Sequence, residues 1–211
     1  MSLRSAVATL LAAASMVTLV GPALADGDAA RGRDLAYTCY GCHGIENYKN
    51  VYPTYSVPKL QGQHPEYLAA ALAGYKSGDR AHATMHAQAS SMTDQDMQDI
   101  AAFLAGTPLK RNPEAKPPAD MPKKAQELCS SCHGPDGVGI TPQYPTIAGQ
   151  HADYIQRALH DYKTGGRKNP VMAGFVADLS EKDMQELARY YADQRPKLTT
   201  AEHSMWFVQK H

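Results

Sequence analysis

Apolar residues recur at helical spacing along this chain, and no segment alternates apolar and polar residues as a half-buried strand does. Each half of the chain contains three helical segments. Two of these segments in each half are bounded by residues that typically start or stop a helix. They span residues 28–37 and 65–76 in the first half, and residues 122–128 and 152–163 in the second. The third follows a hydroxyl residue, Thr93 or Ser180, with a carboxylate three positions later, which predicts a capping box. The sequence therefore predicts an all-α protein.

From Pro58 onward, the second half of the chain repeats the first at a constant offset of 87 residues. From position 62 the sequence reads Gly-Gln-His-Pro-Glu-Tyr, and from position 149 it reads Gly-Gln-His-Ala-Asp-Tyr. Nearer the N-terminus the offset grows to 90, so the first half carries three extra residues, which fall in a tyrosine-rich loop at 44–57. A repeat of this length predicts two tandem domains of the same fold.

The N-terminus has the features of a signal peptide: Arg4, an apolar run over residues 6–20 and the small-residue pattern Ala23-Leu24-Ala25. We expect cleavage after Ala25 and export to a bacterial periplasm, with an uncleaved anchor as the alternative. A proline-rich stretch between the repeats predicts an extended linker. The predicted segments are a signal peptide at 1–25, an N-terminal domain at 26–106, the linker at 107–122, a C-terminal domain at 123–196 and a tail at 197–211.

The charge of the chain is balanced, with 21 basic and 21 acidic side chains. Proteins that bind nucleic acids or anionic membrane surfaces carry a basic excess, so the composition argues against both kinds of partner. After the signal peptide, no stretch is long and apolar enough to span a bilayer. We expect a protein that is not integral to the membrane, and its peripheral association is left open.

All four cysteines lie in two motifs of the form C-x-x-C-H. The motif residues are Cys39, Cys42 and His43 in the first half, and Cys129, Cys132 and His133 in the second. Two thiols one helical turn apart can each form a thioether with a vinyl group of one haem, while the histidine is held beneath the iron. The motifs therefore predict two covalently bound haem c groups, each with its histidine as an axial iron ligand.

Zinc binding and dithiol redox chemistry are the alternatives for C-x-x-C pairs. A zinc site would have to join pairs that are 90 residues apart, and it would leave the histidine after each pair unexplained. A thioredoxin-like site would lie in a βαβ pattern, which this sequence lacks. Haem attachment is the interpretation that accounts for every residue of both motifs.

The second ligand of each iron decides the function. Methionine is the usual ligand where a haem carries electrons, because its thioether raises the reduction potential. Two methionine pairs coincide in the repeat, Met85 with Met172 and Met97 with Met184. Met97 and Met184 have apolar neighbours at helical spacing, which indicates core packing. Met85 and Met172 lie where periodicity is absent and a loop can direct a side chain at iron, so we predict them as axial ligands.

Histidine is the alternative ligand in the first half, because His82 and His86 flank Met85. Either histidine would give a bis-histidine haem of lower potential. The second half has Asn169 and Ala173 at these positions, so the alternative does not extend to both haems. We therefore interpret both histidines as surface residues.

With its signal peptide, two C-x-x-C-H domains, proline-rich linker and paired methionines, the chain resembles the di-haem cytochrome c4 family over nearly all of its mature length. The resemblance implies two class I cytochrome c folds whose haems face each other across the interface. It implies that a backbone carbonyl at Pro58 and at Pro145 accepts the N–H of the proximal histidine. It also implies that Arg80 and Arg167 lie near haem propionates, where ordinary solvated arginines are the alternative. The loop at 44–57 and the tail depart from the pattern.

The resemblance further implies an electron carrier of bacterial respiration rather than an enzyme. With both faces of both irons filled, no substrate reaches the metal, and electrons move by outer-sphere transfer. The expected partners are redox proteins such as a quinol-oxidising complex, a terminal oxidase or a reductase. Two alternatives stay open: a dedicated haem subunit of a periplasmic dehydrogenase or oxidase complex, and an enzyme with one open haem.

Overall fold

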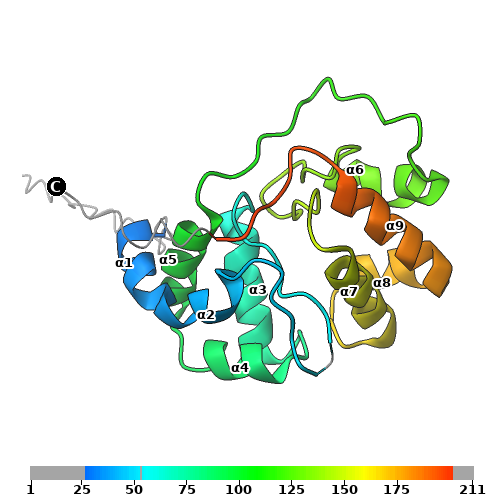
Figure 1. Ribbon diagram of the computed structural model, residues 1–211. Coiled ribbons are helices and arrows are strands. Elements are labelled where there is room, and N and C mark those ends of the chain that lie inside the picture. The colour runs from blue at the N-terminus through cyan, green and yellow to red at the C-terminus, as the bar shows by residue number, and fades with distance from the viewer. Residues whose placement is uncertain (1–26, 53, 202–211) are drawn as a thin grey trace, which may run out of the picture.

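The protein is seen here in a computed structural model, in which residues 27–52 and 54–201 are described. These residues form two helical units that lie side by side (Figure 1). Within the described ranges the chain has helices and three isolated bridges but no strand. The prediction of an all-α protein is confirmed. The predicted signal peptide lies outside the described residues.

The two units have the same order of helices along the chain. In each unit an irregular helical turn leads into the cysteine motif, and only in the first unit does another helix, α1, precede that turn. The first unit contains α1 (Ala29–Leu35), a 3₁₀ turn (Ala36–Thr38), α2 (Tyr40–His43), α3 (Pro65–Ser77), α4 (Ala83–Ala89) and α5 (Asp94–Ala105). The second contains a π-helical turn (Ala125–Cys129), α6 (Ser130–His133), α7 (Ala152–Thr164), α8 (Pro170–Val176) and α9 (Glu181–Asp193).

Both predicted capping boxes are confirmed at the starts of α5 and α9. The Thr93 hydroxyl accepts a bond from the Asp96 N–H at 3.1 Å, and the Asp96 carboxylate accepts one from the Thr93 N–H at 2.9 Å. Ser180 and Asp183 make the same reciprocal pair at 3.2 and 2.8 Å. Each box satisfies N–H groups that the first turn of a helix leaves without an intrahelical partner.

Each unit has its own apolar core along its last long helix. Ile100 and Leu104 of α5 pack in the core of the first unit, and Leu187 and Met184 of α9 pack in that of the second. Met184 is fully buried, and Met97, its repeat equivalent, is 4% exposed. The prediction that this methionine pair serves packing is therefore confirmed.

The structure corrects one expectation about the segments that carry Met85 and Met172. We expected loops there, but both methionines lie on short helices, α4 and α8, of seven residues each. Two turns are too few to show a helical period in the sequence. The helices start at side-chain caps instead, because His82 Nδ1 accepts the Met85 N–H at 3.2 Å and Asn169 Oδ1 accepts the Met172 N–H at 3.1 Å.

The described part of the predicted tail returns to the first unit (Figure 1). The Leu198 N–H donates to the Ala148 carbonyl at 2.9 Å, and Thr199 and Gln61 exchange two backbone bonds at 3.1 Å. Ala201 is 1% exposed within the core of the first unit. This segment therefore crosses the interface and ties the two units together.

Candidate functional site

The two units meet at a pseudo-two-fold interface where equivalent side chains make equivalent bonds. Gln63 Nε2 donates to the Thr146 carbonyl at 2.8 Å, and Gln63 Oε1 accepts the Thr146 N–H at 2.9 Å. Gln150, which follows Gln63 by 87 residues, makes the same two bonds with Lys59, both at 2.9 Å. Amide side chains that pair with backbone groups in this way fix how the units sit against each other.

A cavity of about 870 Å³ lies between the units and is lined by residues of both. Its wall is mainly apolar and contains all four cysteines and both motif histidines, so the two predicted haem sites open into one space. None of the four cysteines forms a disulfide. Burial raises the pKa of Cys39, and it raises that of Cys129 to about 11.

Each motif histidine is held by a backbone carbonyl. His43 Nδ1 lies 3.0 Å from the Pro58 carbonyl oxygen, and His133 Nδ1 lies 2.8 Å from that of Pro145. A carbonyl only accepts, so Nδ1 is the protonated nitrogen and Nε2 carries the free lone pair. Burial lowers the pKa of both histidines, although the carbonyl opposes it. A buried, neutral imidazole with a fixed tautomer is suited to bind a metal. The two carbonyls belong to the prolines that the resemblance places beside these histidines.

Met85 and Met172 line the same cavity as the motif histidines. Both are partly buried, and each follows the N-cap of its helix by three residues. His82, interpreted above as a surface residue, is instead a half-buried N-cap that also lines the cavity. His86 is exposed, and its Nδ1 lies 2.8 Å from the Tyr75 carbonyl oxygen.

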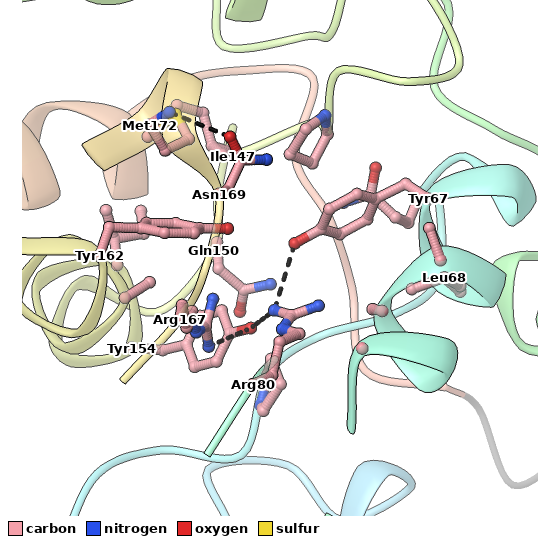
Figure 2. A pocket seen from close by; sticks show the side chains of 18 of the residues that line it. Tyr67, Leu68, Arg80, Ile147, Gln150, Tyr154, Tyr162, Arg167, Asn169 and Met172 are labelled. Carbon is pink, nitrogen blue, oxygen red and sulfur yellow. Dashed lines mark hydrogen bonds between the residues drawn. The ribbon is translucent and has the colours of Figure 1, made fainter. Parts of the chain in front are cut away.

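Arg80 and Arg167 lie at the interface rather than in solvent, and their backbones pair across it in an isolated bridge. Figure 2 shows both guanidinium groups directed at the hydroxyl of Tyr154, to which Arg80 donates at 3.4 Å and Arg167 at 3.1 Å. Arg80 also donates to the Tyr67 hydroxyl at 3.4 Å. Two cations that share one phenol repel each other, so an anionic group beside them would stabilise the site.

Sequence reasoning did not single out four tyrosines that surround these arginines. The Arg80 guanidinium lies over the rings of Tyr67 and Tyr75, and that of Arg167 over those of Tyr154 and Tyr162. All four belong to the blocks that the repeat shares, at positions 67, 75, 154 and 162. Their recurrence was a visible signal, but only the packing of the two units shows that they converge.

Two protein-family models match the chain, Cytochrome c over residues 29–108 and Cytochrome C oxidase, cbb3-type, subunit III over residues 117–190. The chain is also similar to cytochrome c4 of Pseudomonas aeruginosa, with 34% identity over 186 residues that cover 82% of this chain and 91% of that protein. The chain belongs to the cytochrome c4 family. It is thus a c-type cytochrome with two covalently bound haem c groups, and it transfers electrons.

The fold agrees with this membership of the cytochrome c4 family. The structure of reduced recombinant cytochrome c4 from Pseudomonas stutzeri matches with a TM-score of 0.63 and 29% identity, covering 80% of this chain and all of that one. A protein named thiosulfate dehydrogenase electron acceptor, from Stutzerimonas stutzeri, is 27% identical over 184 residues, or 78% of this chain and 82% of that protein. None of the described helices is long and apolar enough to cross a membrane.

The residues around the cavity fit two haem groups. The cavity supplies an apolar wall for a porphyrin and, from each unit, a pair of thiols and an imidazole whose Nε2 is free. Arg167 is 5% exposed, and the Nε atom of Arg80 is buried without a hydrogen-bond partner among the described residues. Carboxylates of a bound cofactor would compensate the positive charge of these two buried side chains.

Proposed function

We propose that this protein is a periplasmic electron carrier of a bacterial respiratory chain, with the domain limits predicted from the sequence. One histidine and one methionine would hold each haem iron. The ligand pairs are His43 with Met85 and His133 with Met172, and the thioethers form at Cys39 and Cys42 and at Cys129 and Cys132. The observation that carries the proposal is that each methionine lines the cavity together with a histidine whose Nδ1 is held by a carbonyl.

When bound, each haem supplies an iron that alternates between the ferric and ferrous states. The histidine and methionine side chains would hold that iron and would leave no ligand position open to a substrate. The carbonyls of Pro58 and Pro145 hold the imidazoles in one orientation, and the caps at His82 and Asn169 hold the helices that carry the methionines. Rigid ligation of this kind favours outer-sphere transfer, because little has to rearrange when the iron changes charge.

Arg80 and Arg167 are proposed to bind haem propionates at the interface. Their guanidinium groups lie together and line the cavity. A guanidinium binds a carboxylate through two parallel hydrogen bonds, which would also orient the porphyrin edge. The two arginines would then hold both cofactors at the domain interface.

A dedicated acceptor role is the second candidate, and the similarity to a thiosulfate dehydrogenase electron acceptor favours it. In that role the chain would still carry electrons, but for one enzyme only. A free carrier purifies alone and exchanges electrons with several periplasmic partners. A dedicated acceptor copurifies with one catalytic subunit.

Carbon monoxide binding to the reduced protein tests whether the haems are closed. We expect the visible spectrum of the reduced protein to stay unchanged under carbon monoxide, because methionine and histidine occupy both faces of each iron. The Met172→Ala variant is the positive control, since it opens one haem. A wild-type protein that binds one equivalent of carbon monoxide would contradict the carrier proposal and favour an enzyme with one open haem.

A further inference from the structure

Two lysines at equivalent positions of the repeat make the same long-range contact in both domains. Lys76 lies in the last turn of α3, and Lys163 lies in the last turn of α7. Lys76 Nζ donates to the Met92 carbonyl at 2.5 Å, and Lys163 Nζ donates to the Leu179 carbonyl at 2.6 Å. Each bond joins residues that are 16 positions apart. The contact therefore belongs to the fold that the two domains share.

The segment that each lysine bond closes carries the proposed methionine ligand. Met85 lies on α4, between Lys76 and its carbonyl partner, and Met172 lies on α8, between Lys163 and its partner. Both helices have only seven residues. A helix this short is marginally stable by itself, so its position depends on what holds the two ends of the segment.

The start of each segment is held across the domain interface. The Ala81 N–H donates to the Gly166 carbonyl, and the Lys168 N–H donates to the Asp79 carbonyl, both at 2.7 Å. These bonds join the two domains just before α4 and α8 begin. At the other end, the lysine bond joins each segment to the long helix of its own domain.

A lysine in the last turn of a helix also has a simpler explanation, because a cation there interacts favourably with the helix dipole. That interaction requires no particular partner. Both lysines instead reach the residue directly before a capping box, whose first residue is Thr93 or Ser180. An ammonium group on a carbonyl makes a charge-assisted hydrogen bond. The bond therefore fixes the span between two helices, and the methionine segment runs across that span.

We propose that Lys76 and Lys163 are positioning residues that keep Met85 and Met172 in place to hold the haem irons. Each lysine fixes the two ends of its segment relative to each other, which restricts the conformations that take the methionine away from the cavity. Without the bond the segment gains conformational freedom, and an added ligand competes better with the methionine. The inference rests on the proposed function and deepens it, because it names what keeps each iron closed.

Imidazole competition on the ferric holoprotein tests the proposal. Imidazole that replaces a methionine abolishes the far-red absorption band of that haem, and the Met85→Ala and Met172→Ala variants assign the band to a domain. We expect Lys76→Ala to lower the imidazole concentration that displaces Met85 by about fivefold, the effect of losing one hydrogen bond. The second-domain haem should not respond. Lys163→Ala should act in the same way on Met172 alone.

Three further variants separate the hydrogen bond from the charge of the lysine. Lys76→Arg and Lys163→Arg keep both the charge and a donor, so we expect imidazole competition close to that of the wild type. Lys182→Ala removes an exposed positive charge from α9 and should leave the competition unchanged. Urea unfolding of the same samples measures global stability. A loss of stability with unchanged imidazole competition would overturn the proposal, because the lysines would then have a structural role only.

The proposal is also overturned if either alanine variant keeps the wild-type imidazole midpoint, or if Lys182→Ala shifts that midpoint as far. The far-red band separates this failure from a failure of the proposed function. If every lysine variant keeps two equivalents of the band and the midpoints do not move, the role of the lysines is rejected and the proposed function stands. If the wild type lacks the band, the proposed ligation itself is wrong.

Discussion

Asp153 in the second domain accepts two hydrogen bonds from Ser56 in the first, from its backbone N–H at 3.0 Å and its hydroxyl at 2.9 Å. Ser56 belongs to the loop at 44–57, in which the first repeat is three residues longer. The equivalent of Asp153 in the first domain is Glu66, which is exposed. The extra loop therefore adds an asymmetric contact to an interface that is otherwise close to two-fold.

Replacing Asp153 by alanine should remove both of these bonds. We expect the free energy of unfolding to fall by about 1 kcal/mol, the usual net value of a hydrogen bond to a partly exposed charged group. Urea unfolding measures the change. Glu66→Ala, at the equivalent position, is the matched control and should stay within about 0.5 kcal/mol of the wild type. Equal losses in the two variants would show that the loop contact contributes nothing specific.

Gln63→Leu should lower the free energy of unfolding by more than the Asp153 substitution does, because it leaves two backbone groups of Thr146 without partners at a buried position. Gln63 is 3% exposed, and leaving buried polar groups without hydrogen-bond partners costs about 2 kcal/mol of stability. Differential scanning calorimetry should show a lower melting temperature. The exposed Gln185 provides the control substitution, Gln185→Leu. A Gln63→Leu protein as stable as the control would mean that these amide bonds do not hold the interface.

Substitutions of His82 distinguish a methionine from a second histidine as the ligand of the first haem iron. If the role of His82 is to cap α4, then His82→Asn, which copies Asn169 of the second domain, should preserve the spectrum of both haems. His82→Ala should preserve the spectrum too, but lose about 1 kcal/mol of stability because a cap is lost. If His82 ligated the first iron, both variants would change the ferric spectrum and raise the potential of that haem.

The capping box of α5 makes stability depend on acid pH. Hydrogen bonds from Thr93, and then from Arg31, lower the pKa of Asp96 from 3.8 to about 2. Because the folded state binds this proton more weakly than the unfolded state, the contribution is complete above pH 4 and is lost as the pH falls toward 2. Melting temperatures of wild type and Asp96→Asn should therefore converge over that range. A constant difference across it would contradict the role of the Asp96 charge.

Residues that lie close together in the sequence were enough to predict haem attachment, the long helices and both capping boxes. Thr93 and Asp96 are three residues apart, and each cysteine motif spans five. The short helices around Met85 and Met172 could not be predicted, because they depend on caps rather than on periodicity.

Contacts between the domains could not be predicted from the sequence either. Arg80 and Tyr154 are 74 residues apart and meet only through the packing of the two units. The sequence marked both residues as parts of the repeat, but it did not indicate that Tyr154 receives bonds from both arginines. The path of the tail back to Gln61 depends on the same packing.

The most direct test of the proposed function is the far-red absorption band that reports methionine sulfur bound to ferric haem, quantified per haem. We predict two equivalents in the wild type and one in each of Met85→Ala and Met172→Ala. One equivalent in the wild type, or a variant that keeps both, would contradict the assignment of these two methionines as the axial ligands that close the irons.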